Sequence, residues 1–214
     1  MALWHLLQTT DSLFPTGAFS HSGGLEGLQL KTAEEAERAI QEILERSFAT
    51  VDLPACALAH RGAADVERLV EIDGAVDALK VPRELREASR SLGRRRLKVV
   101  AAAEEYRLRV EADATPGHQA VVTGMHTSLA GVTREEALLA FVYGTAAGLV
   151  SAAMKLLPLG QTRAQALLSK LGEAAPEWIR AADAMVLEEL GGFTPALDIA
   201  AMRHETAAPR LFIS

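Results

Sequence analysis

The segment from Ala137 to Met154 constrains the fold more than any other, because its eighteen residues, ALLAFVYGTAAGLVSAAM, carry no charge. Thr133 and Glu136 precede it at the spacing of a helix capping box, and Pro158 and Gly160 follow it. The pattern predicts a helix that is apolar on every side, which either crosses a membrane or lies inside a helical bundle. Its borderline length and its many Ala and Gly residues favour the bundle.

Small residues form a stripe along this predicted helix. Gly144, Gly148 and Ala152 lie four residues apart, and small residues at this spacing allow two helices to approach closely. The stripe could serve the protein core or the seam of a homodimer. Tyr143 lies beside it and would need a hydrogen-bond partner if buried.

Composition narrows the possible classes of protein. The length of 214 residues favours one domain, and 49% hydrophobic with 23% charged residues excludes a disordered chain. Aromatic residues make up only 5%, which suits closely packed helices better than a sheet. A net charge of −6 argues against nucleic-acid binding as the main role, because contact with phosphates requires a basic surface. The single cysteine excludes an internal disulfide and every zinc site built from two or more thiolates.

Periodicity, capping residues and prolines predict the remaining helices. Thr32 and Glu35 form a second capping box, and the residue ranges expected to be helical are 33–51, 54–60, 65–79, 83–109, 119–129, 162–171, 176–190 and 195–204. The range 18–30 could also be helical, although Gly23, Gly24 and Gly27 weaken it. No segment alternates as a strand would. We therefore expect residues 1–214 to form one all-α globular bundle of about nine or ten helices.

The motifs of common enzymes are missing from the sequence. There is no P-loop, no dinucleotide-binding glycine motif after a strand, and no nucleophile elbow. His204-Glu205 does not begin a zinc-protease motif, because position 208 is Ala. Ser20 and His21 are adjacent, so they cannot readily pair as nucleophile and base, and a hydrolase that uses Ser20 or Ser22 is a remote alternative.

Cys56 and His60 leave open an alternative function as a stand-alone helical metal-binding protein. They lie four residues apart on one face of a predicted helix, which suits a soft metal ion. Two ligands do not complete a site, and a buried cysteine with a histidine at the helix end is the favoured interpretation. His118 and His126 are expected to be surface or capping residues.

Positive charge is concentrated in one short cluster, Arg94-Arg95-Arg96 with Lys98. The cluster could bind an anion. The favoured interpretation is a solvated helix face, balanced by the acidic residues Glu84, Glu87, Glu104 and Glu105.

The C-terminal segment, RHETAAPRLFIS, ends in three large apolar residues after Pro209, which prevents the helix from continuing. Chain ends are usually mobile unless something holds them. Leu211, Phe212 and Ile213 must therefore either fold back onto the core or dock in the groove of a partner. Both possibilities remain open from the residues alone, and Arg210 could anchor either arrangement.

Several segments together resemble one family, the urease accessory proteins of the UreF type. They are DSLFPTGAFSHSGGLE (residues 11–26), TVDLP (50–54), LREASRSLGRRRL (85–97), AAMKLLPLGQ (152–161) and RHETAAPRLFIS (203–214). They span nearly the whole chain in the right order, and the first and last are the most specific.

The resemblance implies an all-α, homodimeric, cytoplasmic protein that is a chaperone or scaffold, not an enzyme. Such a protein would help to insert nickel into apo-urease, bridging a D/H-type accessory protein and a nickel-carrying G-type GTPase and coupling GTP hydrolysis to metal delivery. No cofactor would be bound stably, and nickel would be handled only transiently in the complex. Neither nucleic acid nor a membrane would be a partner.

The resemblance also implies which residues bind partners. Arg210, Leu211 and Phe212 match the family tail that is expected to order on the D/H-type partner, so the segment at about 203–214 is predicted to be a flexible docking tail. Arg203, His204 and Glu205 match the fixed part of the same segment. Lys155 resembles a lysine at the GTPase-facing surface, and Tyr143 a tyrosine of the same helical region.

Overall fold

The chain is built from helices in the computed structural model, which describes residues 2–214, and no strand is found in that range. The helices are α1 (Ala2–Thr10), α2 (Ala33–Ile43), α3 (Leu53–Arg61), α4 (Val66–Leu79), α5 (Arg83–Leu97), α6 (Glu104–Glu111), α7 (Gln119–Leu129), α8 (Arg134–Leu156), α9 (Gln161–Ala184) and α10 (Pro195–His204). A π-helical stretch, Leu44–Asp52, joins α2 to α3, so the described residues form nine separate helices. The predicted all-α class is confirmed.

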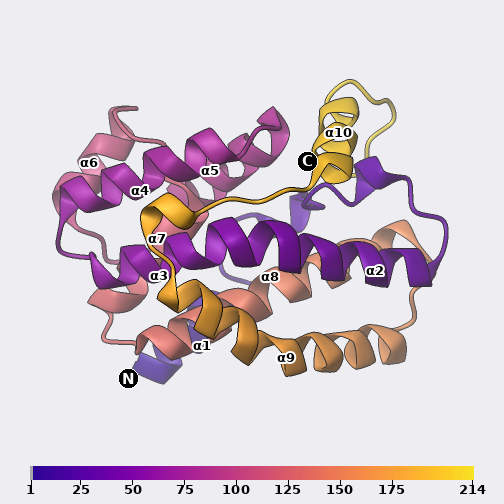
Figure 1. The fold of residues 1–214 in the computed structure, drawn as a ribbon, viewed down its shortest axis with the longest axis horizontal. Helices are drawn as coiled ribbons and strands as arrows, with labels where there is room; N and C mark the ends of the chain where they lie inside the picture. Colours follow the sequence, from indigo (N-terminus) through magenta and orange to yellow (C-terminus); the bar gives the residue numbers. More distant parts are fainter. Residues whose placement is uncertain (1) are drawn as a thin grey trace.

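Helix α8 contains the charge-free segment and begins at the predicted capping box, in which the Thr133 hydroxyl accepts a hydrogen bond from the backbone N–H of Glu136. It packs against α3, α7 and α9, with α9 running alongside it in Figure 1. Half of its most apolar stretch is buried inside the protein. The interpretation of α8 as a helix of the bundle, and not a membrane span, is therefore the one that the fold supports.

Helices α3 and α7 form the closest packed pair of the core. Gly124 makes this possible, because a Cβ atom at that position would lie 2.2 Å from the carbonyl oxygen of Cys56. The predicted range of α7 is confirmed. His118 occupies the N-cap position of α7, as one of the two expectations had it, although its side chain makes no capping hydrogen bond. His118 and His126 are both buried, so the expectation of a surface position is wrong.

The sequence pattern predicts separate helices at 33–51 and 54–60, but the helix is not broken at Asp52-Leu53-Pro54. The backbone from α2 to α3 is continuous, because the π-helical stretch shifts the hydrogen-bond register, and the N–H of Leu53 reaches the carbonyl of Phe48, five residues back. The wider π turn accommodates Pro54, which has no N–H to donate. The second predicted helix therefore extends the first.

Two other predicted boundaries are wrong. The range 83–109 is divided into α5 and α6, because a turn at 98–103 redirects the chain and brings Tyr106 and Val110 of α6 into the core. Conversely, 162–171 and part of 176–190 form the single helix α9, with Pro176 inside it. Pro176 and Gly172, four residues before it, both face solvent, so the carbonyl that the proline leaves unpaired can bond to water.

Residues 18–30 form two short 3₁₀ turns, Ala18–Ser20 and Glu26–Leu28, in place of a helix. Gly23 and Gly24 between them have positive φ angles, which prevent a continuous helix. Gly27 lies against α10, where a Cβ atom would be 2.5 Å from the carbonyl oxygen of Ala200. Figure 1 shows this N-terminal segment beside α10 and the C-terminus.

Asp73 of α4, which interrupts an otherwise apolar stripe, is fully buried. Its carboxylate accepts hydrogen bonds from the Thr115 hydroxyl and from the backbone N–H groups of Gly117 and His118, at 2.6–2.8 Å. Asp73 thus fixes the loop that leads into α7.

Candidate functional site

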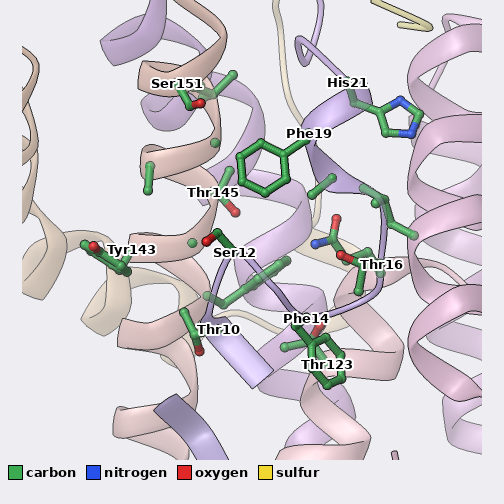
Figure 2. Close-up of a pocket in the computed structure, with 18 of the residues that line it drawn as sticks. Thr10, Ser12, Phe14, Thr16, Phe19, His21, Thr123, Tyr143, Thr145 and Ser151 are labelled. Atoms are coloured by element: carbon green, nitrogen blue, oxygen red, sulfur yellow. The ribbon is translucent and has the colours of Figure 1, made fainter. Parts of the chain in front are cut away.

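A groove of about 630 Å³ runs between α8 and the N-terminal part of the chain. One wall is the small-residue stripe of α8, and the other consists of α1 and the loop that follows it, including Phe14 and Phe19. Gly148 has no atom of another residue near its Cβ position, so the stripe faces the groove over this turn instead of a neighbouring helix. Figure 2 shows Phe19 near Ser151 and Thr145 of α8, with Tyr143 at the rim.

The C-terminal segment folds back onto its own chain, which is one of the two possibilities that the sequence left open. The N–H of Ile213 donates to the carbonyl of Ser20 at 2.9 Å. The C-terminal residue, Ser214, accepts a backbone hydrogen bond from Ser22, and its hydroxyl lies 2.8 Å from Nδ1 of His21. The last two residues therefore extend along residues 20–22.

Glu26 holds the preceding part of this segment. Its carboxylate accepts hydrogen bonds from the backbone N–H groups of Leu211 at 2.7 Å and Phe212 at 2.9 Å, and it lies 2.9 Å from Nε2 of His204. Burial by itself would raise the pKa of Glu26, but these three hydrogen bonds outweigh burial and lower it. Glu26 is therefore ionised at neutral pH and serves as the main acceptor for the tail.

His204 is buried between two carboxylates. Its Nδ1 lies 2.7 Å from Glu84, and its Nε2 faces Glu26. Glu84 also accepts a hydrogen bond from Arg210 at 2.7 Å, so two acidic and two basic side chains alternate in one network.

Lys155 joins the tail to the groove. Its Nζ donates to the carbonyl of Phe19 at 3.2 Å and lies 5.4 Å from the centroid of that ring. It also lies 5.2 Å from the ring of Phe212, which is buried. One ammonium group thus contacts an aromatic ring from each end of the chain.

The other residues that were expected to bind partners are exposed. Tyr143 is 57% exposed and lines the same groove, twelve residues before Lys155 on α8. Arg203 and Glu205 lie at the exposed end of α10, where Glu205 forms an ion pair with Arg83. Leu211 is also largely exposed.

Sequence reasoning missed the roles of Glu26 and Glu84, although both are central to the tail network. Glu26 lies 185 residues from Leu211 along the chain, so no local pattern connects them. Only the resemblance covered Glu26, as the last residue of its first segment.

The alternative metal site at Cys56 and His60 has no support in the geometry. Cys56 is completely buried, and burial raises the pKa of its thiol well above the usual value. The Nε2 of His60 is 3.0 Å from the carbonyl of Val132. Across residues 2–214, no group of three or more His, Cys, Asp or Glu side chains is arranged to hold a metal ion.

The basic cluster is the expected solvated face only in part, because Arg95 and Lys98 are exposed but Arg96 is not. Arg94 pairs with Asp113, Arg95 donates to the carbonyl of Thr16, and Arg96 is buried. Four acidic residues were expected to balance the cluster, but they form ion pairs with other basic side chains. Glu87, for example, pairs with Arg90.

An all-helical bundle with an open apolar groove and a docked chain end has the features of a protein that works through contacts with other proteins. A sequence profile of the family described as UreF matches residues 30–172. The chain is 34% identical to "Urease accessory protein UreF" of Kocuria rhizophila, with 98% of this chain and 95% of that one covered. It is 33% identical to the proteins of the same description from Bacillus sp. (strain TB-90), with 99% of both covered, and Paenarthrobacter aurescens, with 98% and 96%.

The chain belongs to the UreF family of urease accessory proteins. It is therefore an accessory protein in urease maturation and not an enzyme, as the sequence predicted.

Proposed function

We propose that the chain is a cytoplasmic scaffold for nickel insertion into apo-urease. In this proposal residues 203–214 bind a D/H-type accessory protein, and the face around Lys155 and Tyr143 binds a nickel-carrying G-type GTPase. The scaffold couples GTP hydrolysis to metal delivery, handles nickel only transiently and holds no stable cofactor. Neither a membrane nor a nucleic acid takes part.

The position of Lys155 is the observation that supports this proposal most directly. Its ammonium group contacts Phe19 beside the groove and Phe212 of the tail, so the two proposed partner surfaces share one residue. A partner that moves the tail would therefore change the surroundings of Lys155. This arrangement provides a physical route for coupling the two partners.

Exposed apolar side chains support a homodimer. Leu3, Trp4 and Leu7 of α1 are 61%, 71% and 61% exposed, and Leu139 and Tyr143 of the neighbouring α8 are about as exposed. Exposed apolar side chains on neighbouring helices are a common feature of interfaces, and aromatic residues are enriched in them. A second copy of the chain would cover this surface.

The tail assignment is tested by binding to the D/H-type partner. Leu211 and Ile213 are exposed, so Leu211→Ser with Ile213→Ser leaves the hydrogen bonds of the tail in place. We expect partner affinity, measured by calorimetry, to fall at least about tenfold, as for loss of buried anchors in an interface. The control Val81→Ser removes an equally exposed apolar side chain elsewhere and should bind normally. Unchanged binding by the double variant and by a chain lacking residues 203–214 would reject the assignment.

The GTPase assignment is tested by Lys155→Ala, with Lys170→Ala on the exposed face of α9 as the matched control. We expect Lys155→Ala to weaken recruitment of the GTPase in a pull-down while circular dichroism shows an intact fold. Equal recruitment by both variants would remove Lys155 from the proposed surface.

A further inference from the structure

Arg96 points into the protein, unlike the two arginines that precede it. Its side chain is 9% exposed. One terminal nitrogen donates to Nε2 of His126 at 2.8 Å, and the other donates to the carbonyl of Thr9 at 3.2 Å. Both acceptors are neutral groups, so these hydrogen bonds do not balance the charge of the guanidinium.

No carboxylate compensates the charge of Arg96 in the part of the chain that the structure describes. Arg96 takes part in none of the salt bridges there, and the only ionisable side chain that favours its charged form is the buried thiol of Cys56. Burial lowers the pKa of Arg96 to about 10, so the side chain still carries its charge at neutral pH. Burying an unpaired charge is costly, and buried charges are normally paired.

Hydrogen-bond donors without a partner gather around this charge. Five buried side-chain atoms of residues 2–214 lack a partner, and three of them are Nε of Arg96, Oγ1 of Thr123 and Nδ1 of His126. Because Arg96 can only donate, Nε2 of His126 accepts, and the neutral ring carries its proton on Nδ1. The ring is neutral because burial and the nearby Arg96 lower its pKa to about 2. The cluster therefore has spare donors and excess positive charge, which together match an anion.

Two residues of this cluster lie at the wall of the groove, although their unpartnered atoms are covered. Arg96 and Thr123 both line the groove, together with Gln119, Thr127 and Thr9. The ring of Phe14 lies 5.1 Å from the guanidinium carbon, and Figure 2 shows Phe14 and Thr123 at the same end of the pocket. Lys155 also lines the groove, but it lies beside Phe19 and Phe212.

We propose that Arg96 and Thr123 form a binding site for a small monoanion of the carboxylate class at the inner end of this groove. A single guanidinium is neutralised by one negative charge, which favours a monoanion over a phosphate dianion. Its planar array of donors, with Nε free, matches the two oxygens of a carboxylate. The Thr123 hydroxyl supplies an additional donor. Phe14 covers the guanidinium, which favours a small ligand over the side chain of a protein partner.

The test is the response of the full chain to acetate, titrated against chloride at constant ionic strength. Ligand that binds only the folded protein raises its melting temperature. We expect acetate to raise the melting temperature of the wild type saturably, and calorimetry to show one site. Arg96→Met should lose this response, whereas Arg94→Met, an arginine of the same helix that does not line the groove, should keep it.

Thr123→Val provides a second test that retains the charge and the shape of the site. We expect its acetate affinity to be about tenfold weaker, because one hydrogen bond to a charged group is lost. The proposal is overturned if acetate stabilises the wild type no more than chloride does, or if Arg96→Met responds like the wild type. Saturation by phosphate at a lower concentration than by acetate would overturn the assignment to monoanions.

Discussion

The ammonium group of Lys155, on α8, lies 5.2 Å from the ring centroid of Phe212, which belongs to the C-terminal segment. The same group lies 5.4 Å from Phe19. We expect Lys155→Met, which keeps the aliphatic length but removes the charge, to weaken tail docking by about 0.5–1 kcal/mol. Limited proteolysis of the C-terminal segment measures this change, and Lys155→Arg should protect the tail as well as the wild type does.

Glu26→Gln tests the main acceptor of the tail. In the wild type the Glu26 carboxylate is the hydrogen-bond partner of Leu211, Phe212 and His204. The amide of glutamine keeps one acceptor oxygen but carries no charge. We expect the free energy of unfolding in urea to fall by about 1.5–3 kcal/mol, because hydrogen bonds to a charged group are involved. Glu205→Gln, which breaks only an exposed ion pair with Arg83, should cost less than about 1 kcal/mol. Equal losses in both variants would contradict the central role of Glu26.

Acid sensitivity is predicted for the buried His126. Its pKa is lowered from 6.5 to about 2, so below pH 6.5 the unfolded chain binds a proton that the folded chain does not. This difference makes stability fall as pH falls, at about 1.4 kcal/mol per pH unit for one group. His126→Gln keeps an acceptor for Arg96 but cannot titrate. Urea unfolding at about pH 6 and about pH 5 should show a smaller loss in this variant, and equal slopes would refute the prediction.

Gly27→Ala tests the close approach of the N-terminal turn to α10. The added methyl group would lie 2.5 Å from the carbonyl oxygen of Ala200, so backbone must move. We expect destabilisation of about 1–3 kcal/mol by the usual cost of overpacking. Gly74→Ala in α4 meets no atom within 4 Å and should stabilise the protein by about 0.5–1 kcal/mol. Thermal unfolding of the two variants should shift in opposite directions.

Asp73→Asn tests the anchor of the loop before α7. The amide nitrogen would face donors that now bond to a carboxylate oxygen, so at least one buried N–H or hydroxyl group loses its acceptor. We expect a loss of about 1–3 kcal/mol in urea unfolding. Amide hydrogen exchange at Gly117 and His118 should accelerate more than exchange in α9, and uniform acceleration would contradict a local anchoring role.

Local signals in the sequence predicted the fold well where the decisive contacts are also local. Both capping boxes, at Thr32 and Thr133, form as predicted, because their partners lie three residues away. Helix boundaries that were predicted from prolines are wrong in two places. Pro54 and Pro176 lie inside continuous helices, because a π-helical register shift in one case and a solvent-facing carbonyl in the other remove the cost of the missing N–H.

The candidate site was harder to predict, because distant parts of the chain assemble it. Sequence resemblance singled out Lys155, His204 and Arg210, but it gave no hint that Glu26 and Glu84 bind them into one network. Arg96 shows the same limit. Three consecutive arginines look alike in sequence, and only the packing of α5 against α7 determines which of them is buried.

The attachment of the tail to Glu26 and to residues 20–22 also sets a thermodynamic threshold for any protein that binds the tail in another conformation. Such a protein competes with an intramolecular ligand, so its apparent dissociation constant equals the intrinsic constant divided by the fraction of tails that are released. Each tenfold decrease in that fraction weakens apparent affinity tenfold, which corresponds to about 1.4 kcal/mol. Substitutions that loosen the tail without touching its exposed side chains should therefore strengthen binding.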